Sequence, residues 1–181
     1  IQAERGAVEM WLQPLWDGDD GGNHTLFLWG GGGQQLHLRK DGISNLVFDY
    51  FSDQGGCGAP TSVAHWRAGI WRHLAITWDT RGETQIRLYV DGTQVAQTTC
   101  SGVAYPADPH FWVGSDPGGP WLAVDAVVDD LRISAAPRIG GSAGSHLYVA
   151  VGDRVTVLDG AGRWVTDLVH PAFVDLRGIA T

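Results

Sequence analysis

The chain has 181 residues, a formal net charge of −8, nine tryptophans and 26 glycines. The acidic balance without any basic cluster argues against nucleic acid as a partner, and no apolar run approaches the ~18 residues that a membrane span requires. Glutamate is limited to Glu4, Glu9 and Glu83 and lysine to Lys40, whereas long helices favour both residue types. This composition therefore predicts an all-β protein.

Apolar and polar residues alternate with a period of two, which is the pattern of half-buried strands. In the first strand Val8, Met10 and Leu12 share one face, while Glu9 and Trp11 lie on the other. Further strands are expected at intervals of about 8–12 residues, at 26–29, 36–39, 46–51, 61–66, 71–78, 86–90, 93–99, 111–114 and 123–134. This spacing predicts a two-sheet antiparallel β-sandwich, or jelly roll.

Turn residues mark the connections between these strands. Asp91-Gly92 predicts a tight hairpin, and the glycine-rich stretch 52–60 is expected to be a loop. Cys57 and Cys100 are the only cysteines. A disulfide between them is the favoured interpretation, and two buried free thiols are the alternative.

The composition changes near residue 135, where a Gly/Ser-rich stretch without aromatic residues is typical of a linker. We therefore divide the chain into a sandwich (1–136), a linker (137–145) and a C-terminal segment (146–181). Three strands are expected in that last segment, as a short β-meander too small to bury a face alone: 146–151, 154–158 and 163–168.

Four segments in this order resemble those of laminin-G-like, concanavalin-A-like domains, over about residues 4–136: GAVEMWLQPLWDGDDGGNHTLF, WRHLAITWD, IRLYVDGTQVA and VVDDLRIS. The resemblance implies a jelly roll that often binds glycans or protein partners, often with a structural calcium. Such domains usually carry one or two strands before the first segment, which pair with the closing strand. We therefore expect a missing N-terminal strand and an open sheet edge.

The C-terminal segment resembles an NHL-type β-propeller repeat, on the residues LYVAVGDRVTVLDGAGRWVTDL. The resemblance implies one blade, whereas a closed propeller needs roughly 4–8 blades. We therefore expect the full polypeptide to be longer than this chain.

Two acidic clusters are candidate sites for structural Ca²⁺, which prefers hard oxygen ligands. Asp19 and Asp20 lie in the loop 16–24, and the alternative for them is a solvated turn. Asp129 and Asp130 lie in the closing strand, where the resemblance implies that an acidic residue often binds calcium. The alternative for this second pair is a carboxylate that caps a turn or pairs with the neighbouring arginine.

Tryptophan is the candidate ligand contact, because a flat indole stacks on the apolar face of a sugar ring and its N–H bonds a hydroxyl. Trp16, Trp66 and Trp121 lie in or beside loops and are chosen for this role; the alternative is that they pack under their own loops. The tryptophans inside strands are assigned to the core: Trp11, Trp71, Trp78 and Trp112. Three polar neighbours of Trp16 complete the expected binding set: Asp17, Asn23 and His24.

No catalytic site is expected. A laminarinase-type glycosidase carries E-x-D-x-x-E on one strand, and this chain has no such string. The preferred interpretation is an extracellular, non-catalytic module that binds a glycan or an extracellular protein. The alternative is a structural subunit of a surface assembly or filament, which self-associates by strand exchange through the open edge. A fragment of a polysaccharide-active enzyme ranks third.

Overall fold

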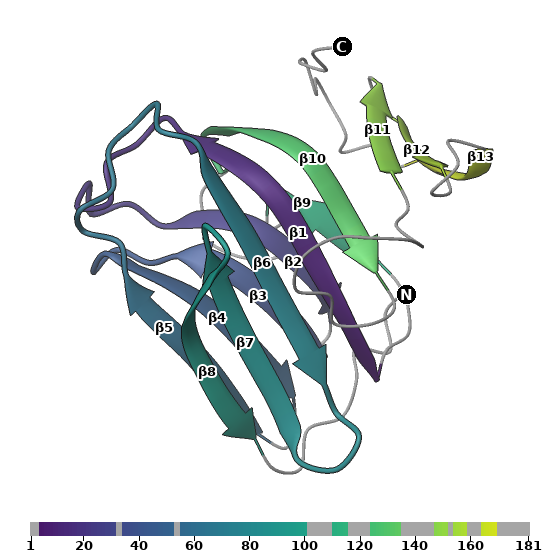
Figure 1. The fold of residues 1–181 in the computed structure, drawn as a ribbon, viewed down its shortest axis with the longest axis horizontal. Coiled ribbons are helices and arrows are strands. Elements are labelled where there is room, and N and C mark those ends of the chain that lie inside the picture. Colours follow the sequence, from purple (N-terminus) through teal and green to yellow (C-terminus); the bar gives the residue numbers. More distant parts are fainter. Residues whose placement is uncertain are drawn as a thin grey trace.

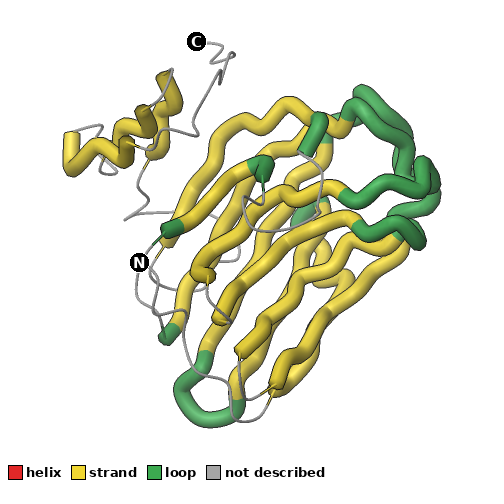
Figure 2. The backbone as a smooth tube through the Cα atoms, turned by 180° about the vertical axis from the view of Figure 1, so that it is seen from behind, coloured by secondary structure: helices red, strands yellow, loops and turns green. Residues whose placement is uncertain are grey.

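The structure is a computed structural model that describes residues 4–31, 34–52, 55–100, 110–115 and 124–134, with the backbone of 147–151, 154–158 and 164–169. This part of the chain consists of strands and loops, and none of it forms a helix able to cross a membrane. Two antiparallel five-stranded sheets lie face to face, as Figures 1 and 2 show from opposite sides. The predicted all-β jelly-roll sandwich is confirmed.

The first sheet has the order β10-β1-β6-β7-β8. It is assembled from β1 (Arg5–Pro14), β6 (Arg72–Asp79), β7 (Thr84–Val90), β8 (Thr93–Cys100) and β10 (Ala126–Ser134). The predicted alternation holds in β1, where Val8, Met10 and Leu12 are buried between the sheets. Because successive side chains of a strand point to opposite faces, Glu9 and Trp11 lie on the outer face.

The second sheet has the order β5-β4-β3-β2-β9. Its strands are β2 (His24–Gly31), β3 (Gln34–Lys40), β4 (Asn45–Ser52), β5 (Gly55–Ser62) and β9 (Phe111–Val113). The prediction of a loop at 52–60 and a strand at 61–66 was wrong, because β5 begins at Gly55 and Val63 to Trp66 form a turn. Glycine can still form the backbone ladder to β4, and an edge position tolerates Pro60.

Large apolar side chains fill the space between the sheets. The indole rings of Trp29 and Trp78 come from opposite sheets and meet with their centroids 5.7 Å apart. Trp78 is 1% exposed, as its assignment to the core predicts. Gly6 is required beside it, since a Cβ there would collide with the Trp78 ring.

The tight hairpin predicted at Asp91-Gly92 connects β7 to β8. Both residues have positive φ, 50° and 77°, as expected of the turn that matches strand twist. The Asp91 carboxylate accepts the backbone N–H of His73 (2.9 Å) and pairs with Arg72 (3.0 Å). The turn is therefore tied to the start of β6.

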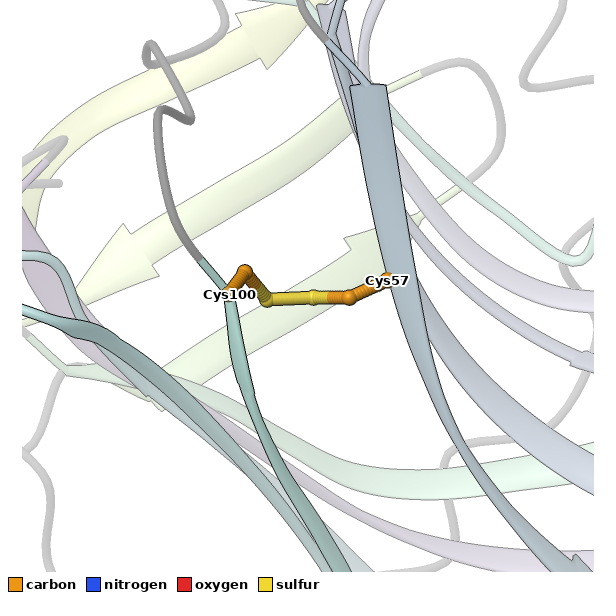
Figure 3. The surroundings of a disulfide bond; sticks show 2 residues. All are labelled: Cys57 and Cys100. Carbon is orange, nitrogen blue, oxygen red and sulfur yellow. A yellow bond between two sulfur atoms is a disulfide. The ribbon is translucent and has the colours of Figure 1, made fainter.

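A disulfide joins Cys57 in β5 to Cys100 at the end of β8, with Cα atoms 5.9 Å apart (Figure 3). β5 and β8 are end strands of opposite sheets, so the bond closes one side of the sandwich.

Reducing this disulfide is expected to lower the free energy of unfolding by about 2–4 kcal/mol, because the unfolded chain loses its cross-link. Thermal melts with and without reductant measure the loss. Alkylation of the unfolded chain without reductant checks the pairing, and two labels per chain would contradict it.

The C-terminal segment forms a separate antiparallel sheet of β11 (Leu147–Val151), β12 (Arg154–Leu158) and β13 (Trp164–Val169). The predicted three-stranded meander is thus present. An NHL-type blade stays a prediction, as does the division into sandwich, linker and tail, because the meander alone does not identify a propeller. The proposed linker 137–145 lies outside the described residues.

Candidate functional site

The polar loop between β1 and β2 packs on the turn that follows β5. Gly18 donates its N–H to the Trp66 carbonyl (3.0 Å), and the Asp17 carboxylate accepts the N–H of Ala68 (2.9 Å). A Cβ on Gly18 would overlap the carbonyl of Val63, so glycine is required at this crossing. Asp17 therefore joins two loops in the structure.

Trp16 and Trp66 are buried beneath these loops, with 5% and 2% of their surface exposed. The Trp16 ring stacks on His24 at 4.7 Å and lies nearly parallel to Trp66 at 6.3 Å. Its Nε1 donates to the Val124 carbonyl at 2.8 Å. The expectation that these two rings present a stacking face to a ligand is not met, since they pack under their own loops.

Lys40, the only lysine, is fully buried at the centre of this region. Its ammonium donates to the Asp20 carboxylate and to the Gly22 carbonyl (3.0 Å), and it lies 5.7 Å from the Trp16 ring centroid. His24 Nε2 bonds the other Asp20 oxygen at 2.8 Å. We call Trp16, Asp20, His24 and Lys40 the Lys40 cluster.

Partial burial raises the pKa of Asp20, but hydrogen bonds from Lys40, His24 and the Gly22 amide outweigh it. The pKa falls from the ordinary 3.8 to about 2. The carboxylate is therefore charged at neutral pH and balances the buried ammonium. The Lys40 cluster is thus an internal ion pair capped by aromatic rings.

The loop oxygens proposed for calcium are already bound by groups of the protein. Asp20 accepts from Lys40, Asn23 Oδ1 accepts the Gly42 N–H (2.8 Å), and Asp19 lies 3.5 Å from Arg67. In the part of the chain that the structure describes, no three His, Cys, Asp or Glu side chains form a group able to hold a metal. Calcium in this loop would have to displace the Lys40 contact of Asp20, and it stays a prediction.

Asp129 and Asp130 lie at an irregularity in β10, opposite the stretch of β1 from Glu9 to Trp11. Asp130 has a positive φ of 49° and pairs with Arg132 at 2.7 Å, while Asp129 accepts the Asp130 N–H at 2.8 Å. The contacts match the alternative of a carboxylate paired with its neighbouring arginine. Calcium at this position stays a prediction, and melting temperatures with excess calcium and with chelator are its test.

Large apolar side chains are exposed on the outer face of the first sheet, although Trp11 and Trp71 were assigned to the core. Trp11 is 41% exposed and Trp71 is 40% exposed. The core assignment fails because both alternate with inward residues: Trp11 stands between Met10 and Leu12, and Trp71 precedes Arg72, whose guanidinium lies over the Trp66 ring. The alternation in β1 already contained this signal.

Strand register brings these side chains together. Trp11 is paired with His73 of β6, and their rings meet edge to face at 5.2 Å. Two residues after Trp11 in β1, Gln13 is paired with Val127 of β10. The side-chain amide of Gln13 donates to the Gly69 carbonyl (2.8 Å). We call this surface the Trp11 face and define it by six residues: Trp11, Gln13, Leu15, Trp71, His73 and Val127.

Besides the Lys40 cluster, a second cluster of polar side chains lies on the outer face of the second sheet. His37 of β3 and Asp49 of β4 are paired there. Arg39 Nε donates to Asp49 (2.7 Å), and Thr25 Oγ1 bonds His37 Nε2 (3.1 Å). Burial raises the pKa of Asp49, against the opposing effect of the Arg39 guanidinium. Gly58 leaves room for this carboxylate, because a Cβ there would contact Asp49.

Two further tryptophans have a predicted role, Trp112 in the core and Trp121 as a ligand contact. Trp112 of β9 is half-buried, and its ring lies 6.0 Å from that of His110. Trp121 lies outside the described residues, so its predicted role stays a prediction. The structure thus joins Trp16, Asp17, His24 and Trp66 in one packed region, which does not include the exposed rings of Trp11 and Trp71.

Known structures share this fold at low sequence identity. The CBM40 domain of the Ruminococcus gnavus IT-sialidase, bound to α2,3-sialyllactose, matches with a TM-score of 0.58 and 12% identity, over 77% of this chain and 79% of that one. The receptor-binding domain of botulinum neurotoxin D matches with a TM-score of 0.60 and 10% identity, over 86% and 48% of the two chains.

Domains LG4-5 of the mouse laminin α1 chain match with a TM-score of 0.54 and 16% identity, over 77% of this chain and 41% of that one. No curated protein sequence matches the chain. The model of one protein family matches residues 2–138, which is most of the chain and nearly all of the sandwich. The chain belongs to that family, the concanavalin A-like lectin/glucanases superfamily.

Proposed function

We propose that the chain is a non-catalytic recognition module that binds a glycan through the Trp11 face. The observation that carries the proposal is the pair of half-exposed indoles, Trp11 in β1 and Trp71 immediately before the neighbouring strand β6. Exposed apolar patches with polar rims are typical of interaction sites. Trp71 stands one residue before β6 and two residues before His73, which is the cross-strand partner of Trp11.

The groups around the indoles suit a sugar. An indole covers the apolar face of a pyranose ring, and ring stacking contributes on the order of 1 kcal/mol by analogy with aromatic pairs. The Gln13 amide and the His73 imidazole border the rings and supply polar contacts for hydroxyl groups. The structure of the R. gnavus domain with sialyllactose supports a glycan as ligand for this fold.

Two observations support the remaining parts of the proposal. The disulfide between Cys57 and Cys100 favours an extracellular location, because such bonds persist in oxidising compartments. A non-catalytic role is favoured because the chain lacks the E-x-D-x-x-E string that supplies the paired carboxylates of laminarinase-type glycosidases. Both stay proposals until they are measured.

The test replaces the two exposed rings. Trp11→Ala and Trp71→Ala are each expected to weaken binding several-fold to whichever glycan the native chain selects from an array, because each removes one stacking surface. Isothermal titration measures the affinity, and a thermal melt shows that the fold is retained. Phe51→Ala is the matched control, because Phe51 is equally exposed (40%) but belongs to β4 of the other sheet.

Unchanged affinity in both tryptophan variants would contradict the Trp11 face as the site. Equal weakening in Phe51→Ala would do the same, because it would show a non-specific effect of losing an exposed ring.

Strand exchange is the second candidate. The observation in its favour is that β10 is the last strand of its sheet and pairs with β1. The irregularity at Asp130 counts against it, because irregular, charged edges discourage pairing between chains. Sedimentation of the full chain separates the candidates, since strand exchange requires a dimer or larger assembly.

A further inference from the structure

We infer that the ligand of the Trp11 face is an uncharged glycan and that the face discriminates against anionic sugars. This inference rests on the proposed function and adds the charge class of the ligand. It follows from the ionisable groups that strand register places beside the rings.

Two carboxylates border Trp11 directly. Asp129 is its cross-strand partner in β10, and Glu9 lies two residues earlier on the same face of β1. Directly paired residues have Cβ atoms about 5 Å apart, and residues two apart along a strand are separated by roughly 6–7 Å, so both acids lie beside the Trp11 ring. In water a like charge at about 5–7 Å weakens the binding of an anion roughly three- to fourfold.

The described cations near the face do not cancel these charges. Arg132 is paired with Glu9 across the strands, but its guanidinium bonds Asp130 at 2.7 Å. Arg72 points to the other side of the sheet and pairs with Asp91 at 3.0 Å. Arg87 also lies on the outer face but two strands away, in β7. The chain's net charge of −8 acts in the same direction.

His73 is a further titratable group on this face, and it contacts the Trp11 ring. Its imidazole would favour an anion only when protonated. Binding is therefore measured at about pH 8, where an ordinary imidazole is neutral. Under these conditions Glu9 and Asp129 determine the sign of the field at the rings.

The experiment compares sugars that differ in charge with little change in size, namely oligogalacturonate and its methyl ester. The native chain is expected to bind the uncharged member of a pair about tenfold more tightly at low salt, from two repulsions of the size given above. The double variant Glu9→Gln/Asp129→Asn is expected to close most of this gap. Asp19→Asn/Glu83→Gln removes the same charge from exposed positions elsewhere and should leave the gap in place.

The inference is overturned if anionic sugars bind as tightly as their uncharged partners, while Trp11→Ala still weakens both; the proposed function then stands. It is also overturned if the control double variant reduces the difference in affinity between uncharged and anionic sugars to the same extent as the Glu9/Asp129 double variant does. Failure of every sugar to bind, or binding that ignores Trp11, overturns the proposed function itself.

Discussion

Replacing Trp66 with alanine is expected to lower the free energy of unfolding by about 3–5 kcal/mol, the usual cost of removing a buried tryptophan. Trp66 is 2% exposed and packs between the Trp16 ring and the Arg72 guanidinium, so its loss leaves a cavity beneath two loops. Trp16→Ala should cost a similar amount, because it also removes the hydrogen bond to the Val124 carbonyl. Denaturant titrations measure both losses.

The exposed rings of Trp11 and Trp71 should contribute much less to stability than the buried rings of Trp16 and Trp66. Trp11→Ala and Trp71→Ala should each change stability by less than about 1 kcal/mol, as is usual for surface positions. If Trp66→Ala left stability unchanged but abolished glycan binding, the original choice of Trp16 and Trp66 as ligand contacts would be restored. The four variants therefore assign each pair of tryptophans to one role.

The loops that cover Trp16 and Trp66 also support the Trp11 face. Asp17 holds the N–H of Ala68, and the next residue, Gly69, donates to the Pro14 carbonyl (2.7 Å) and accepts from Gln13. These bonds position the segment that ends in Trp71 beside β1. Asp17, which was expected to contact a ligand, thus helps to orient Trp71, for which we now propose that role.

Most of the fold could be predicted from the sequence because alternation and turn chemistry are local signals. β1, the hairpin at Asp91-Gly92 and the core position of Trp78 follow from patterns of a few residues. β5 could not be found this way, because its glycines and Pro60 carry no apolar periodicity and only the ladder to β4 makes it a strand. Non-local backbone pairing outweighs local propensity there.

The candidate site was harder to predict because burial depends on what a loop packs against. Trp16 borders a loop and was expected to be exposed, yet the segment 63–68 covers it. Nothing in the residues around Lys40 shows that its ammonium reaches Asp20, 20 residues earlier. By contrast, the outward position of Trp11 followed from its alternation with Met10 and Leu12.

The Lys40 cluster gives the second large effect. Asp20→Ala is expected to lower the free energy of unfolding by about 3–5 kcal/mol at neutral pH, because it leaves a fully buried ammonium without its counter-ion. The matched control is Asp19→Ala. The Asp19 carboxylate is 58% exposed and lies 3.5 Å from the Arg67 guanidinium. Such surface ion pairs contribute about 0–1 kcal/mol to stability. Urea titrations of both variants measure the difference.

The pH dependence of stability checks the same cluster by an independent route. The pKa of Asp20 is about 2 in the folded chain and near the ordinary 3.8 when unfolded, so the unfolded state binds the proton more tightly. The stabilisation is therefore complete above about pH 4 and is lost as the pH falls towards about 2. Subtracting the Asp20→Asn profile from that of the native chain should isolate a loss of at most about 2 kcal/mol in this window, since one pKa unit corresponds to 1.36 kcal/mol and solvent screens a partly exposed carboxylate. Parallel profiles would show that the Asp20 carboxylate does not hold the Lys40 ammonium.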